Sequence, residues 1–353
     1  MDQADGGPHN DVGGPPAPGP HNQQAANLPP SLKTIGGVPA ILVHMPKLPV
    51  QVSIDEQRVR LQLVRSPCGT GKTYAIRLAI HRALLEGKRV VVVVPRRSLA
   101  RALAADLGLP CYLDQPGQIR GSTVVCLDSV HRVDTWALEG EELVTLRVDL
   151  LVLDEVQQLC RHAFGGTLRK KRAIDRCWRA MRDLCQVSDR IRASDAGIDL
   201  LAITMLRSWV GADATAQILV NTYKGPQVDT FVRRSETAWM REVAKEIGKG
   251  RKVWIYFTSK RACKAISKLI SSQFPHLRAL VIHSEKTAGE ARACLRDPQK
   301  FGDYDLVCCT GSVGTGVSVE HTDSWSVFGH LPATKPGKGP SAPDVYQGLY
   351  RVR

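Results

Sequence analysis

The 353-residue sequence has no run of roughly 18 consecutive apolar residues, so it lacks the pattern of a transmembrane helix. Its N-terminus lacks the charged region and apolar core of a secretory signal. The ten cysteines include no CxxC pair and no cysteine–histidine cluster at zinc spacing, which argues against a disulfide framework or a structural metal. We therefore expect a soluble intracellular protein, nuclear or cytoplasmic and not secreted, with reduced thiols and no membrane contact.

Residues 1–45 are poor in apolar side chains and rich in Gly, Pro, Asn and Gln, which predicts a disordered tail. Residues 1–46 hold one lysine against three aspartates, while the whole chain carries +14, so the remaining chain carries +16. A folded part this basic favours a polyphosphate partner, nucleic acid first. The alternative at this point is a basic protein without such a partner.

Apolar runs alternate with helical patterns from about residue 52 onward, which predicts an α/β fold with parallel, doubly wound sheets. The first set of predicted strands covers residues 61–64, 90–94, 124–127 and 150–153, with a helix at 72–86 ended by Gly87. The second set covers residues 218–220, 253–257, 279–282, 306–309 and 326–328, with helices at 237–247 and 261–273. We expect two tandem lobes, at residues 52–212 and 217–353.

A basic segment at residues 161–192 holds ten Lys or Arg against three Asp. Apolar residues from Ile174 to Cys185 recur at helical spacing, with Arg172, Arg176 and Arg179 mostly on the other side. The pattern predicts an amphipathic helix. Its basic face is either solvated or a surface that contacts phosphates.

The strongest motif is SPCGTGKT at residues 66–73, which follows one predicted strand and opens a predicted helix. Glycines at such a turn let backbone N–H groups surround phosphate oxygens, and the helix N-terminus adds a favourable dipole. Lys72 is expected to reach the β- and γ-phosphates, and Thr73 to bind Mg²⁺. We assign ATP binding to Ser66, Gly69, Thr70, Gly71, Lys72 and Thr73.

A pair of acids, Asp154 and Glu155, follows the apolar run at residues 150–153. A carboxylate at a strand end downstream of a P-loop holds the Mg²⁺ shell, and its neighbour orients and deprotonates the attacking water. We therefore assign the metal to Asp154, together with Thr73, and the general base to Glu155. The alternative is a pair of merely solvated acids.

Further motifs follow in a fixed order. In the predicted first lobe they are PRRSLA at 95–100, LDSVHR at 127–132 and SDA at 194–196. In the predicted second lobe they are NTYK at 221–224, FTSK at 257–260, TGSVGTGVS at 310–318 and QGLYRVR at 347–353. This series resembles a superfamily 2 helicase, and most closely the herpesvirus-type replication-origin-binding protein family, over residues 60–353.

The resemblance implies two RecA-like lobes and assigns roles to single residues. It implies contacts with the nucleic-acid backbone from Arg97, Ser129, Thr258 and Thr310, and a place near the nucleotide for Gly316. It implies a coupling role for Asp195 and a catalytic role for Gln347, with Arg351 as the arginine finger and Arg353 as second candidate. Because the last motif ends at Arg353, we expect the second lobe of the family to continue beyond this sequence.

The resemblance implies an ATP- and Mg²⁺-dependent helicase or translocase acting on single-stranded or forked DNA in replication, with other replication proteins as possible partners. One alternative is a nucleic-acid-stimulated ATPase that remodels RNA or protein–DNA complexes without unwinding. Another is a non-catalytic remnant that binds nucleotide and DNA. Intact Lys72, Asp154, Glu155 and Arg351 argue against the remnant.

Overall fold

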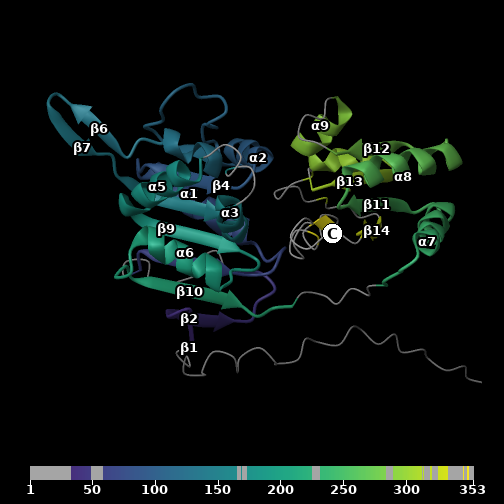
Figure 1. Cartoon of the computed structure of the whole chain (residues 1–353), viewed down its shortest axis with the longest axis horizontal. Helices are drawn as coiled ribbons and strands as arrows, with labels where there is room; N and C mark the ends of the chain where they lie inside the picture. Colours follow the sequence, from purple (N-terminus) through teal and green to yellow (C-terminus); the bar gives the residue numbers. More distant parts are fainter. Residues whose placement is uncertain are drawn as a thin grey trace, which may run out of the picture.

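The computed structural model describes residues 33–48, 59–164, 168, 173–224, 231–283, 289–311, 313, 319, 325–332, 345, 348 and 349. Within them, two α/β lobes are each built on a separate sheet (Figure 1). The first lobe contains β1 (Lys33–Ile35), β2 (Val38–Val43), β3 (Leu61–Arg65), α1 (Lys72–Leu85), β4 (Val90–Val94), α2 (Arg97–Leu107), β5 (Thr123–Cys126), η2 (Leu127–Arg132), β6 (Trp136–Glu139), β7 (Glu142–Thr145), β8 (Val148–Asp154), α3 (Val156–Ala163), α5 (Ile174–Gln186), β9 (Ser188–Asp195), α6 (Leu200–Val210) and β10 (Ala216–Asn221). The second lobe contains α7 (Glu236–Gly248), β11 (Lys252–Phe257), α8 (Lys260–Gln273), β12 (Ala279–Ile282), α9 (Glu290–Arg296), η3 (Pro298–Asp303), β13 (Leu306–Thr310) and β14 (Trp325–His330).

The first sheet has the strand order β1-β2-β10-β3-β9-β8-β4-β5, and every pair except β1–β2 is parallel. From β3 the chain moves toward β5 through α1 and α2, whereas from β8 it moves toward β10 through α3, α5 and α6. Right-handed crossovers in opposite directions place these two groups of helices on opposite faces of the sheet. The direction changes between β3 and its neighbour β9. The predicted doubly wound sheet is confirmed for this lobe.

Burial explains why the runs of valine and leucine form interior strands. All five valines of β4 are at most 1% exposed, as expected for a strand covered by helices on both faces. The predicted amphipathic helix is α5, in which Cys177, Met181 and Leu184 are buried while Arg176 and Arg179 are exposed. Helix periodicity therefore identified the packed side correctly.

The second sheet has the strand order β12-β13-β11-β14, and all of its pairs are parallel. Alternate residues of its central strands enter two different apolar clusters. Trp254 and Tyr256 of β11 lie in one cluster, and Val253, Ile255 and Phe257 lie in the other. Both faces of this sheet are therefore buried. Successive side chains of a strand point to opposite faces, so a strand covered on both sides alternates between two clusters.

Two predicted boundaries of the first lobe are wrong. Residues 33–43, assigned to the disordered tail, form β1 and β2 at the edge of the first sheet, where Val38 is completely buried. The strand at 218–220, assigned to the second lobe, is part of β10 and pairs in parallel with both β2 and β3. β10 joins this sheet by pairing with β3, and β2 joins it by pairing with β10; local composition does not reveal such non-local pairing.

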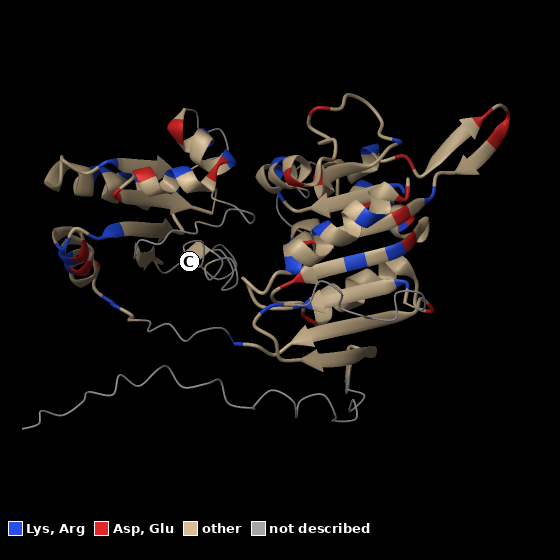
Figure 2. Ribbon diagram, turned by 180° about the vertical axis from the view of Figure 1, so that it is seen from behind, with Lys and Arg blue, Asp and Glu red and all other residues tan. Residues whose placement is uncertain are grey.

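A hairpin formed by β6 and β7 projects from the first lobe (Figure 1). Figure 2 shows acidic residues at its end, where Glu139 and Glu142 face each other in the strand register. The Arg89 guanidinium holds its base, because it donates to the carbonyl oxygens of Asp134 and Leu146, both at 2.9 Å. The two ends of the projection are thus fixed to the sheet by one side chain.

Candidate functional site

The P-loop connects β3, an interior strand of the first sheet, to the first residue of α1. Gly69 and Gly71 have φ of 81° and 84°, in the left-handed region where a side chain would be strained. Turns of this kind let successive backbone N–H groups converge on an anion. The backbone thus bends at the two positions where the sequence supplies glycine.

Lys72 begins α1, and its ammonium folds back over the P-loop. Nζ donates to the carbonyl oxygen of Ser66 and, at 2.8 Å, to that of Pro67. Thr73 is exposed in the first turn of the helix. The positive end of the helix dipole and the ammonium therefore lie at the same side of the loop, a combination that favours bound anions.

Asp154 ends β8 and is only 8% exposed. Burial raises the pKa of this carboxyl, while a hydrogen bond from the Ser194 hydroxyl at 2.9 Å and the nearby Lys72 act in the opposite direction. A buried carboxylate is costly unless it is paired or binds a cation. Its position beside the P-loop therefore suits a ligand of a divalent metal.

Glu155 has a φ of 53° and is the one non-glycine residue with positive φ among the described residues. A side chain in this region costs about 1–3 kcal/mol, and such residues cluster at functional sites. Glu155 occupies this strained turn between Asp154, the last residue of β8, and α3, which begins with the next residue.

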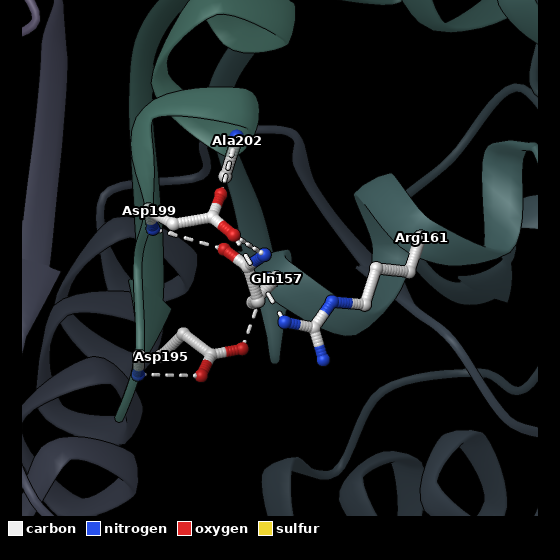
Figure 3. Close-up of polar contacts among 6 residues, drawn as sticks. Gln157, Arg161, Asp195, Asp199 and Ala202 are labelled. Atoms are coloured by element: carbon white, nitrogen blue, oxygen red, sulfur yellow. Dashed lines mark hydrogen bonds and ion pairs between the residues drawn. The ribbon is translucent and has the colours of Figure 1, made fainter. Parts of the chain in front are cut away.

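A polar network joins the segment after β8 to the segment after β9 (Figure 3). Asp195 accepts hydrogen bonds from the backbone N–H groups of Gln157 and Gly197, both at 2.9 Å. The Gln157 side chain exchanges two hydrogen bonds with Asp199, which also caps α6 and lies 3.9 Å from Arg161. Burial raises the pKa of Asp195, and the two backbone donors oppose that shift. The sequence motifs identify Asp195 as a site residue but not Gln157 or Asp199, although Gln157 lies two residues after the predicted base Glu155.

The three strands that carry these groups, β3, β9 and β8, are neighbours in the sheet. Their carboxyl ends bear the P-loop, Asp195 and Asp154, at the place where the direction of winding changes. Ligands of open α/β sheets bind in this crevice outside the carboxyl ends of the strands. Residues more than 120 positions apart in the chain therefore form one site.

The predicted nucleic-acid contacts of the first lobe lie on two segments. Arg97 is exposed at the first position of α2, and Ser129 is half-buried in η2. Arg132, in the same predicted DNA-facing segment as Ser129, donates to the carbonyl oxygens of Tyr112, Gln115 and Gly117. The guanidinium of Arg132 therefore organises the loop before β5.

The predicted contacts of the second lobe lie at two strand ends. Thr258 follows β11 and its backbone N–H donates to His330 at 3.3 Å, whereas Thr310 ends β13 and is 9% exposed. The two lobes touch near Thr310, where Arg96 Nη1 donates to the carbonyl oxygen of Gly311 at 2.6 Å. The segments expected to bind DNA in each lobe are thus in contact.

Four predicted site residues lie outside the described residues: Gly316, Gln347, Arg351 and Arg353. Their roles stay predictions. The ten cysteines all lie among the described residues, none of them forms a disulfide bond, and nine are buried. No helix in the described part of the chain is long and apolar enough to cross a membrane.

Solved structures of two other proteins have a similar fold. S. cerevisiae Dbp5 bound to RNA and ADP BeF3 aligns with a TM-score of 0.58 at 17% identity, covering 83% of this chain and 76% of that chain. The DUF1998 helicase MrfA bound to DNA and AMPPNP aligns with a TM-score of 0.52 at 15% identity, covering 83% of this chain and 48% of that chain. At these identities the likeness shows the fold alone, which is that of two RecA-like lobes.

Several curated relatives are replication origin-binding proteins of herpesviruses. The protein of Human herpesvirus 6A (strain Uganda-1102) is 23% identical over 320 residues, covering 86% of this chain and 38% of the relative. That of Bovine herpesvirus 1.1 (strain Cooper) is 27% identical over 338 residues, covering 87% of this chain and 37% of the relative. This chain thus spans less than two-fifths of the length of these relatives. The profile of the family described as "Origin of replication binding protein" matches residues 41–237, more than half of the sequence, and the chain belongs to that family.

Proposed function

We propose that this chain is an ATP-driven motor that moves along or opens DNA, with a role in DNA replication. One observation carries the proposal: Lys72, Asp154 and the Asp195 network meet at the carboxyl ends of three adjacent strands. A site that only bound a nucleotide would need the P-loop alone. The buried acids and their link to the P-loop supply the parts that hydrolysis and mechanical coupling require.

The residues present fit ATP and Mg²⁺. Gly69 and Gly71 would curve the loop around the phosphates, and the Lys72 ammonium would exchange its carbonyl partners for β- and γ-phosphate oxygens. Thr73 and the buried carboxylate of Asp154 would hold Mg²⁺, which neutralises charge that develops on the phosphates. Glu155 would orient and deprotonate the attacking water.

The second lobe would complete the site and grip the nucleic acid. We assign the arginine finger to Arg351, with Arg353 second, a supporting polar role to Gln347, and a position near the nucleotide to Gly316. Closure of the lobes would move Arg97 and Ser129 relative to Thr258 and Thr310. These residues would contact the sugar–phosphate backbone of the DNA. DNA affinity should therefore fall steeply as the salt concentration rises and depend little on the DNA sequence.

The test is DNA-stimulated ATP hydrolysis by the full chain. Lys72→Ala should abolish it, because the ammonium that binds the phosphates is lost. Lys88→Ala is the matched control, because Lys88 lies in the same lobe and pairs with Glu86 on the surface. A Lys72→Ala protein that hydrolyses ATP at the wild-type rate would falsify the assignment.

Two other functions stay distinguishable by experiment. Strand displacement with and without ATP separates a helicase from an ATPase that remodels RNA or protein–DNA complexes without unwinding. Single-turnover hydrolysis in the presence of DNA separates both from a non-catalytic protein that binds nucleotide and DNA. Family membership and the intact Lys72, Asp154 and Glu155 support the motor.

A further inference from the structure

Asn221, the last residue of β10, is 5% exposed and uses its whole side-chain amide. Nδ2 donates to the carbonyl oxygen of Met45 at 2.8 Å and to Ser66 Oγ at 3.0 Å. Oδ1 accepts from the backbone N–H groups of Met45 and Tyr223, both at 3.1 Å. An asparagine amide has two donor hydrogens and two acceptor positions, so all four are satisfied. This one buried group joins three segments that lie far apart in the sequence.

The bond to Ser66 begins a chain of hydroxyl groups inside the P-loop. Ser66 Oγ lies 2.6 Å from Thr70 Oγ1, and Thr70 Oγ1 donates to the carbonyl oxygen of Pro67 at 2.7 Å. Because the Thr70 proton goes to Pro67, the proton between the two hydroxyls comes from Ser66. The chain therefore runs from Asn221 through Ser66 and Thr70 to Pro67, and each bond polarises the next. This accounts for a serine at the position where the usual motif has glycine.

The carbonyl oxygen at the end of this chain is also a partner of Lys72. The Lys72 ammonium donates to the carbonyl oxygens of Ser66 and Pro67, so the hydroxyl chain and the lysine share the Pro67 carbonyl. The Thr70 carbonyl is held from the other side, because it accepts from the backbone N–H of Leu48 at 2.7 Å. Two residues outside the P-loop thus hold it in place: Asn221 of β10 through Ser66, and Leu48 of the segment after β2 through Thr70.

The segment that leaves the first lobe begins at the same amide. Beyond Asn221, the backbone N–H of Thr222 donates to Val43 at 2.8 Å, and the Tyr223 ring packs edge-on against His44 at 5.8 Å. The Tyr223 N–H is one of the four partners of Asn221. The Asn221 side chain therefore bonds both to Ser66 and to the start of the connection between the lobes.

We infer that Asn221 is a positioning residue that sets the shape of the P-loop through Ser66 and couples nucleotide binding to the interlobe segment. The inference rests on the proposed function, since it assumes that the loop binds ATP. A group that merely filled the core would affect stability alone. A group with the inferred role must also change nucleotide affinity, and it must do so through Ser66.

The first test is a double-mutant cycle on the full chain, with a fluorescent non-hydrolysable ATP analogue and Mg²⁺ as the probe. Asn221→Ala and Ser66→Ala should each weaken binding about 5- to 20-fold, and the double variant should bind no more weakly than the worse single variant, because both break one chain. Thr222→Val is the matched control, since it removes a hydroxyl that contacts Val43 and His44 and should bind within twofold of wild type. Wild-type affinity in Asn221→Ala, or a double variant with the product of both losses, overturns the inference.

The second test needs only the Ser66→Ala variant, which removes one oxygen atom and keeps the Asn221 amide. Hydrogen exchange of the Met45 and Tyr223 amides, which both donate to Asn221, should slow at least threefold in wild type when the analogue binds. In Ser66→Ala, at analogue concentrations that saturate it, this slowing should be lost. Equal slowing in both proteins overturns the inference. A wild-type chain that binds no analogue instead overturns the proposed function, so the two failures are distinguishable.

Discussion

Ser194→Ala should raise the Mg²⁺ requirement of ATP hydrolysis. Ser194 is 1% exposed, and its hydroxyl donates to Asp154 Oδ1 at 2.9 Å, so the substitution leaves a buried carboxylate oxygen without this donor. A hydrogen bond to a charged group contributes about 1.5–3 kcal/mol, and a factor of ten corresponds to about 1.4 kcal/mol. Loss of a group that orients a metal ligand costs roughly 10- to 100-fold in metal affinity, which agrees with that range.

The assay is a titration of free Mg²⁺ at fixed ATP and DNA, read as the steady-state rate of hydrolysis. We expect half-saturation at about 10- to 100-fold more Mg²⁺ for Ser194→Ala, with a rate at saturation within a few-fold of wild type. Ser194→Thr keeps the hydroxyl and should titrate like wild type. Ser188→Ala is the matched control, because Ser188 is buried at the other end of β9 and donates to Leu184 instead.

Two results would refute this reasoning. Half-saturation of Ser194→Ala within twofold of wild type would show that the hydroxyl does not hold Asp154 for the metal. An equal shift in Ser188→Ala would show that the effect comes from disturbance of β9 in general.

Three further outcomes are expected. Glu155→Gln should slow single-turnover hydrolysis roughly 10²- to 10⁴-fold while leaving affinity for a non-hydrolysable analogue within a few-fold, because only the base is lost. Burial and two nearby arginines lower the pKa of His131 below its ordinary value of 6.5. The neutral imidazole therefore contributes its full stabilisation above pH 6.5, and this contribution is lost as the pH falls below 6.5. His131→Gln should flatten the decline in Tm between about pH 7.5 and 5.5. Arg89→Met should lower the free energy of unfolding of the first lobe by about 2–4 kcal/mol in denaturant titrations, because the carbonyls of Asp134 and Leu146 lose a charged donor.

The interior of the fold could be predicted from the sequence because burial on both faces leaves a local signal. The valines of β4 and the apolar run of β11 predict strands covered on both faces from composition alone. The P-loop and the acids at 154–155 are likewise contiguous motifs whose spacing reflects a local backbone requirement. Each of these features is specified within one short stretch of chain.

The edge of the first sheet could not be predicted in the same way. β2 has the composition of a strand but follows two glycines and contains Pro39, so its surroundings indicated a loop. β10 has an ordinary apolar run, but its membership in the first sheet depends on pairing with β2 and β3, which lie more than 150 residues earlier. Asn221 lies in the NTYK motif at 221–224, but its role could not be predicted, since that role follows from the partners that this pairing brings to it.

The first lobe extends from β1 to β10 and is therefore longer at both ends than residues 52–212. A first lobe cut at residues 52–212 contains every motif of its site yet excludes β2, β10, Leu48 and Asn221. These are the groups that hold the Thr70 carbonyl and the Ser66 hydroxyl from behind. The phosphate-binding loop is therefore specified by eight consecutive residues but is shaped by two strands from the ends of the lobe. The second of those strands leads to the other lobe. If Asn221 has the inferred role, coupling between nucleotide and lobe movement would begin in the sheet itself, before any group of the second lobe takes part.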